Sequence, residues 1–100
     1  MCLSGQPIDA KEALQCGLVS RVLPADQLLD AALALAEAIA AKSRPVALAA
    51  KDAVNKAYET TLAAGVEYER RVFHATFALK DRKEGMEAFA AKRKPNFVHE

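Results

Sequence analysis

The sequence has little glycine, proline or cysteine: four glycines, four prolines and two cysteines in 100 residues. Two cysteines are too few for a disulfide framework, and they indicate a reduced, cytosolic setting. Alanine is abundant instead, with 22 residues. Because alanine has the lowest free-energy cost in a helix, this composition predicts a mainly α chain. A chain of this length forms at most one domain, with a modest core.

Long hydrophobic runs are also absent. The run of alanine and leucine at residues 31–41 is interrupted by Glu37, and no stretch holds 18 consecutive large apolar residues. This excludes a membrane span. Residues 1–9 contain neither a basic region nor a long apolar region, so we expect no signal peptide. The sequence therefore predicts a cytoplasmic protein with no membrane partner.

Motifs that carry chemistry are missing as well. His74 and His99 are far apart, and no cysteine or carboxylate completes the spacing of a zinc site. The four isolated glycines form neither a phosphate-binding loop nor a dinucleotide fingerprint, and no serine lies in a G-x-S-x-G elbow. The sequence therefore predicts no metal and no redox cofactor, and it offers no catalytic residue.

The charge is unevenly distributed, although the net charge is only +1. Residues 70–94 contain eight lysines and arginines against three acids, a local charge of +5. Such a segment can bind an anionic partner, or it can be a solvated helical face with cations near helix C-termini. Because interleaved stacking aromatics and a recognition motif are lacking, we expect no nucleic-acid partner.

The local patterns predict four or five helices and one short strand. Asp9, with Glu12 three residues later, caps a helix over residues 10–16, and Gly17 ends it. Residues 18–22 are short and rich in β-branched side chains, so they are the one strand candidate. No second strand exists to pair with it, which leaves an orphan strand.

Longer helices are expected over residues 26–42 and 45–58, separated by a break at residues 43–45, and from Thr60 or Thr61 onward. Gly65 suggests that another helix packs closely there. A last helix is expected from Asp81, capped by its own side chain, to about residue 93. Its inward residues are expected to be Met86, Phe89 and Ala90. Residues 95–100 form a tail, in which His99 is expected to be mobile.

Two segments carry a family resemblance. Residues 81–97, DRKEGMEAFAAKRKPNF, match the pattern D-x-x-E-G-x-x-A-F-x-E-K-R-x-P-x-F except at Ala91, where the pattern has glutamate. Residues 3–19 resemble the pattern LTGRPIDAxEALxxGLV, with Ser4 and Gln6 in place of its threonine and arginine. Residues 49–55 match xAKxAVN. The chain thus resembles the closing part of the enoyl-CoA hydratase/isomerase (crotonase) family. The substitution at Ala91 puts one local ion pair in doubt and not the resemblance.

The resemblance implies the C-terminal helical, trimer-forming region of the crotonase fold. Residues 1–24 would end the connection from the spiral part of that fold, residues 25–94 would be its helices, and residues 95–100 its tail. Family members are lyases of fatty acid metabolism that add water to a 2-trans-enoyl-CoA. Their two catalytic glutamates and their oxyanion hole precede the matched region, so we expect this chain alone to be inactive, and Met1 to mark a truncation or an internal start.

The resemblance also implies three binding residues. Lys92 would contact the phosphates of CoA, Phe89 would lie by the CoA nucleotide, and Phe73 beside the acyl chain. From helical spacing alone, core packing is the favoured explanation of both phenylalanines. A favourable charge at the helix C-terminus explains Lys92 as well as a binding role does. The implied ligand is acyl-CoA and the implied partners are copies of the chain, in a trimer or hexamer. The alternative is a non-enzymatic, self-associating helical module.

Overall fold

A computed structural model describes residues 1–100. The chain forms five α-helices and one short 3₁₀ helix, as the composition predicts. The elements are α1 (Ala10–Gln15), α2 (Ala25–Ala40), α3 (Arg44–Ala57), α4 (Leu62–Ala75), η1 (Thr76–Ala78) and α5 (Lys80–Ala90). They divide into two compact units, Met1–Ala34 and Leu35–Glu100, which are described separately.

The first unit begins with α1, whose two ends match the sequence prediction. Asp9 Oδ1 accepts a hydrogen bond from the Glu12 N–H at 2.7 Å. Gly17 follows the helix with φ of 72°, and the Leu18 N–H returns to the Ala13 carbonyl at 2.9 Å. These bonds satisfy terminal groups that the helix itself leaves open. The predicted capping of α1 at Asp9 and its end at Gly17 are therefore confirmed.

The predicted strand at residues 18–22 is wrong. This segment is neither helix nor strand, and no strand occurs anywhere in the chain. A strand exists only as part of a hydrogen-bonded ladder, and residues 1–100 contain no second extended segment that could pair with it. The β-branched composition therefore lacks the partner that would turn it into a strand.

Helix α2 carries the predicted apolar stripe but buries none of its residues. Leu28, Leu29 and Ile39 are 58%, 68% and 55% exposed. No helix of the chain combines the length and the apolar character needed to cross a bilayer. The stripe is therefore an exposed apolar surface.

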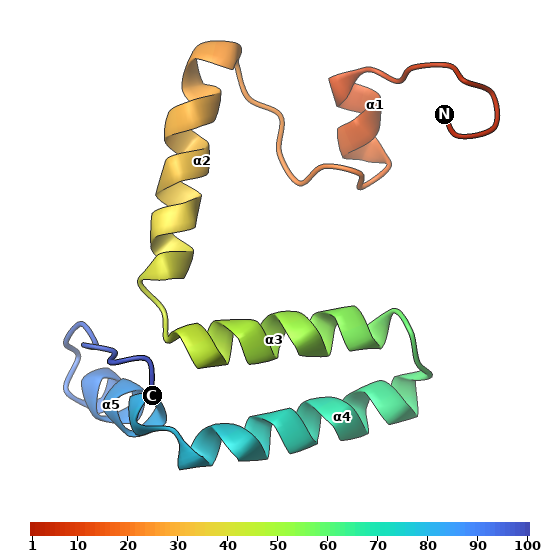
Figure 1. The fold of residues 1–100 in the computed structure, drawn as a ribbon. Coiled ribbons are helices and arrows are strands. Elements are labelled where there is room, and N and C mark those ends of the chain that lie inside the picture. Colours follow the sequence, from red (N-terminus) through yellow and green to blue (C-terminus); the bar gives the residue numbers. More distant parts are fainter. The chain divides into compact units, whose positions relative to one another are not determined.

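The second unit is built on α3 and α4, which run side by side in opposite directions (Figure 1). The Tyr68 hydroxyl on α4 donates to the Asp52 carboxylate on α3. A Cβ added to Gly65 would lie 3.8 Å from Ala57 Cα, so the start of α4 lies close to the end of α3. This agrees with the close packing that Gly65 suggested.

Helix α5 differs from its prediction at both ends. Leu79 is its N-cap residue, and no side chain caps the helix there. Asp81 is instead 1% exposed, and its two carboxylate oxygens accept the N–H groups of Val98 and His99. The helix ends at Ala90 rather than near residue 93, because Lys92 adopts φ of 53° and reverses the chain. Asp81 therefore holds the tail and does not cap the helix.

The expected inward face of α5 is also wrong. Met86, Phe89 and Ala90 are exposed, whereas Asp81 and Ala88 are each 1% exposed. Residues 81, 85 and 88 share one helical face, and a Cβ on Gly85 would meet the Phe97 ring at 3.6 Å. The returning tail covers this face. The position of the tail, and not the spacing of apolar residues along α5, therefore determines which residues of the helix are buried.

Candidate functional site

The first of the three predicted site residues, Lys92, lies in the turn that ends α5. The Lys92 N–H donates to the Phe89 carbonyl at 3.2 Å, and the Arg93 N–H donates to the Ala88 carbonyl at 3.0 Å. These two bonds form a Schellman motif, in which glycine is the usual residue at the position of Lys92. The lysine side chain is exposed, and it takes part in no ion pair or side-chain hydrogen bond of the chain.

Glu84 fixes the residues that follow Lys92. Arg93 donates to Glu84 Oε1 from Nη1 at 2.6 Å and to Oε2 from Nη2 at 2.9 Å. The Asn96 N–H also donates to Oε1, at 2.6 Å. The hydrogen bonds from Arg93 and Asn96 lower the pKa of Glu84 to about 2. The carboxylate is thus charged near neutral pH and closes the turn around Lys92.

Asp81 forms a second, more buried tail contact. Burial opposes ionisation of its carboxyl, but Ser43 and the N–H groups of Val98 and His99 outweigh this effect and lower its pKa. Ser43 is itself buried and lines the same hollow as Asp81. His99, which was expected to be free, is bonded to another helix, because its Nδ1 accepts the Arg44 N–H at 3.1 Å. The tail therefore connects α5 to the start of α3.

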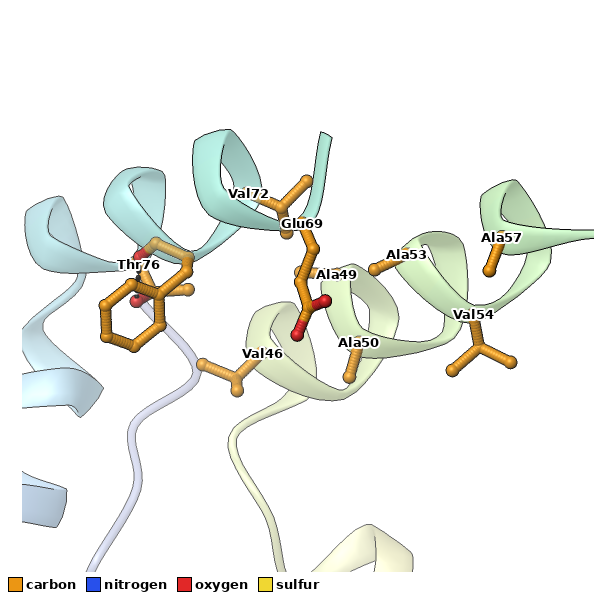
Figure 2. A pocket seen from close by; sticks show the side chains of 10 residues that line it. Val46, Ala49, Ala50, Ala53, Val54, Ala57, Glu69, Val72 and Thr76 are labelled. Carbon is orange, nitrogen blue, oxygen red and sulfur yellow. Dashed lines mark hydrogen bonds between the residues drawn. The ribbon is translucent and has the colours of Figure 1, made fainter. Parts of the chain in front are cut away.

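Phe73 lies in an open apolar groove between α3 and α4, of about 390 Å³. Figure 2 shows this groove, with small side chains of α3 on one wall and Glu69 extending from α4 on the other. Phe73 is 58% exposed, and its ring meets that of Phe77 edge-on at 5.3 Å. The Arg82 guanidinium lies 3.9 Å above the Phe77 ring. A partly exposed aromatic cluster thus lies at one end of the groove.

The three predicted residues do not share one pocket. The groove that contains Phe73 includes neither Phe89 nor Lys92. Phe89 is on α5 and is 83% exposed. Core packing within this chain therefore explains neither phenylalanine. Their roles beside a CoA ligand stay predictions.

Half of the cations in the basic segment at residues 70–94 have a carboxylate partner. Four of its eight cations form ion pairs: Arg71 with Glu67, Lys80 with Glu100, Lys83 with Glu87, and Arg93 with Glu84. A fifth, Arg82, lies over an aromatic ring. Lys92 and Lys94 are thus the cations at the end of α5 that have no carboxylate partner. No group of three or more His, Cys, Asp or Glu side chains could hold a metal ion.

Sequence reasoning missed Asp81, Glu84, Arg93 and His99 as a connected set. Asp81 was predicted to cap the helix, and Glu84 was counted only among the acids of the basic segment. Their spacing of three does place both carboxylates on one side of α5, next to Gly85. That pattern could have indicated a face covered by something polar, but only the return of the tail shows what covers it.

Comparisons with known proteins match the whole chain. A family model described as enoyl-CoA hydratase/isomerase matches residues 1–100. A probable enoyl-CoA hydratase of Rhizobium meliloti is 54% identical over 99 residues, which are 99% of this chain and 38% of that protein. The mitochondrial enoyl-CoA hydratase of Pongo abelii is 50% identical over 97 residues, 97% of this chain and 33% of that protein.

A solved structure agrees with these sequence matches. The crystal structure of enoyl-CoA hydratase subunit I of Geobacillus kaustophilus superposes with a TM-score of 0.90 and 39% identity. The match covers 97% of this chain and 38% of that one. The chain thus spans less than two-fifths of the length of each of these relatives.

Proposed function

The chain belongs to the enoyl-CoA hydratase/isomerase family and has the fold of a helical segment of its members, and on that premise we propose that it supplies three functions to an enoyl-CoA hydratase. These are contacts between subunits, part of the lid over the acyl group, and a cationic contact to CoA. The reaction of such an enzyme would be syn addition of water across the double bond of a 2-trans-enoyl-CoA. The compartment we propose is the cytoplasm.

The observation that carries this proposal is the amount of apolar side chain that the chain leaves uncovered. Only Ala13 and Ala88 are buried hydrophobic residues. Within the second unit, Leu48, Leu62 and Phe89 are 59%, 85% and 83% exposed. Such a surface suits a protein that packs against further protein. It also favours the alternative function, a self-associating helical module without activity.

We propose that the chain alone does not hydrate enoyl-CoA. The catalytic glutamates and the oxyanion hole of the family belong to the part of the fold that residues 1–100 do not match, and no acid of this chain has a motif that assigns it either role. Asp81 and Glu84 are already bound to the tail. The family motifs therefore assign no carboxylate of this chain to the activation of water and no donor pair to the thioester oxygen.

Two measurements on the purified chain test the proposal. Crotonyl-CoA hydration is expected to stay at the buffer rate, and light scattering after gel filtration is expected to show a dimer or larger species. Leu35→Glu on the stripe of α2 should shift the protein toward monomer, whereas the control Gln27→Glu, off the stripe of the same helix, should not. Turnover that survives repurification would refute the inactivity, and a cooperative monomer would refute the subunit contacts.

A further inference from the structure

Lys92 is one of two residues other than glycine with a positive φ, the other being His99. Side chains with a Cβ rarely adopt this conformation because the Cβ approaches the following carbonyl oxygen. For His99, two hydrogen bonds offset the strain. Its N–H donates to Asp81, and its Nδ1 accepts the Arg44 N–H. The Lys92 side chain has no partner in the chain, so nothing within the fold compensates a lysine at this position.

The chain itself shows how the same turn is built when no side chain is needed. After α1, the Gly17 N–H donates to the Leu14 carbonyl at 3.1 Å and the Leu18 N–H to the Ala13 carbonyl at 2.9 Å. This is the same Schellman motif that follows α5, with glycine in place of lysine. Glycine adopts φ of 72° there without the strain that Lys92 bears at 53°. The lysine is therefore not explained by the turn.

The residues on either side of Lys92 keep it in this conformation. Arg93 is held by both oxygens of Glu84, and the Asn96 N–H is held by one of them. The side chain of Glu84 is 22% exposed, compared with 45% for Arg93, so the pair is partly shielded from water. Pairing also removes the charge of Arg93 as a competing site for an anion. Within residues 91–93, the single available cation is thus Lys92.

We propose that Glu84 and Arg93 are positioning residues, which hold Lys92 in a strained left-handed turn so that its ammonium group is presented to the phosphates of CoA. This inference rests on the proposed contact between Lys92 and CoA and adds how the chain orients that contact. Lysine suits the role because its ammonium is a compact charge that approaches phosphate oxygens from several directions. A preset turn also lowers the entropy lost when the contact forms.

The first test separates the strain from the contact. Lys92→Gly removes the ammonium group and the Cβ, so it should raise the melting temperature of the 100-residue chain by about 4–8 °C. Its affinity for CoA, followed by NMR titration at low salt, should fall by about twofold to fivefold, the range of an exposed ion pair. Lys94→Gln removes a cation two residues away and serves as the matched control, with a smaller loss. Affinity for pantetheine, which lacks phosphates, should not change.

Dephospho-CoA distinguishes the two sources of phosphate. If Lys92→Gly weakens binding of CoA but not of dephospho-CoA, the contact is to the 3′-phosphate; equal weakening assigns it to the diphosphate. Either result supports the phosphate contact. Unchanged CoA affinity in Lys92→Gly, or no CoA binding by the wild-type chain, would overturn both the contact and the positioning.

The second test addresses the positioning residues alone. The double variant Glu84→Gln, Arg93→Gln keeps the net charge and leaves Lys92 in place, and it should weaken CoA binding by about twofold because the turn is no longer fixed. In a Lys92→Gly background the same double change should have no further effect on affinity. Additive losses, or an unchanged affinity of the double variant, would refute the positioning role while leaving the Lys92 contact standing. Circular dichroism of each variant verifies that α5 remains folded.

Discussion

Replacing Ala88 by leucine tests which face of α5 the chain buries. The Ala88 side chain is 1% exposed, and it shares a helical face with Asp81, also 1% exposed, and with Gly85, which lies against the Phe97 ring. Two residues further on, Ala90 is exposed. Leucine has nearly the same helix propensity as alanine, so the two sites differ mainly in the space available for a larger side chain.

The expected size of the effect follows from this difference. A leucine at position 88 adds three carbon atoms where the tail already covers the helix, and overpacking of this kind destabilises by about 1–3 kcal/mol. The same change at the exposed Ala90 should stay within about 0.5 kcal/mol of the wild-type chain. For a chain of this size, 1 kcal/mol corresponds to about 4–8 °C in melting temperature. Thermal unfolding followed by circular dichroism at 222 nm can resolve the two variants.

The two variants together can refute the reasoning. If Ala90→Leu lowers the melting temperature and Ala88→Leu leaves it unchanged, the buried face is the one that the helix pattern alone suggests, and the returning tail does not cover Ala88. If both variants melt like the wild-type chain, α5 is not packed against the tail at all. Only a loss confined to Ala88→Leu agrees with the structure.

Three further predictions concern the turns and the tail. Gly17→Ala should destabilise α1 by about 1 kcal/mol through its positive φ alone, because no atom lies within 4 Å of the added Cβ; helix content by circular dichroism checks this. The pKa of Glu84 is lowered from 4.5 to about 2, so its contribution to stability is present above pH 4.5 and is lost as the pH falls toward 2; an acid titration of Glu84→Gln should lack this part of the transition. The Arg44 amide should exchange its hydrogen more slowly in the His99→Asn variant than in the His99→Ala variant. Asparagine tolerates φ of 64° and has a side-chain oxygen that can accept the Arg44 N–H, whereas alanine has no acceptor. Equal exchange rates in the two variants would contradict the hydrogen bond.

The sequence predicts what depends on neighbouring residues. The cap at Asp9 and the turn at Gly17 each depend on one or two side chains and their immediate backbone, and both are present in the structure. A break between α2 and α3 is present too, but it lies at residues 41–43 rather than 43–45, because α3 already begins at Arg44. Motifs of this kind are satisfied within a few residues, so they can be recognised without knowledge of the rest of the fold. The family resemblance adds the identity of the fold in the same way, through residues that stand close together in the chain.

The contacts of the tail could not be predicted in that way. The bonds from Val98 and His99 to Asp81 span 17 and 18 residues, and the bond from Arg44 to His99 spans 55. An aspartate at the start of a helix has a local interpretation as a cap, and nothing in its immediate sequence indicates the competing partner. The prediction of the inward face of α5 was wrong for the same reason. In the sequence, a polar helix face that backbone N–H groups cover looks the same as a polar face exposed to solvent.

The wrong strand and the uncovered stripe of α2 have one physical cause. A run of β-branched residues such as 18–22 and an apolar stripe such as that of Leu28 and Ile39 both describe a surface that needs a partner: a ladder of hydrogen bonds in the first case, an apolar face in the second. Residues 18–22 form no strand, and Leu28 and Ile39 are 58% and 55% exposed. The most buried polar side chain, Asp81, is covered by a folded-back tail that donates two hydrogen bonds to it, rather than by a large apolar core. The stability of the second unit and its association with other protein therefore depend on different residues. A substitution such as Leu35→Glu should change the oligomeric state without disturbing the contacts between α5 and the tail.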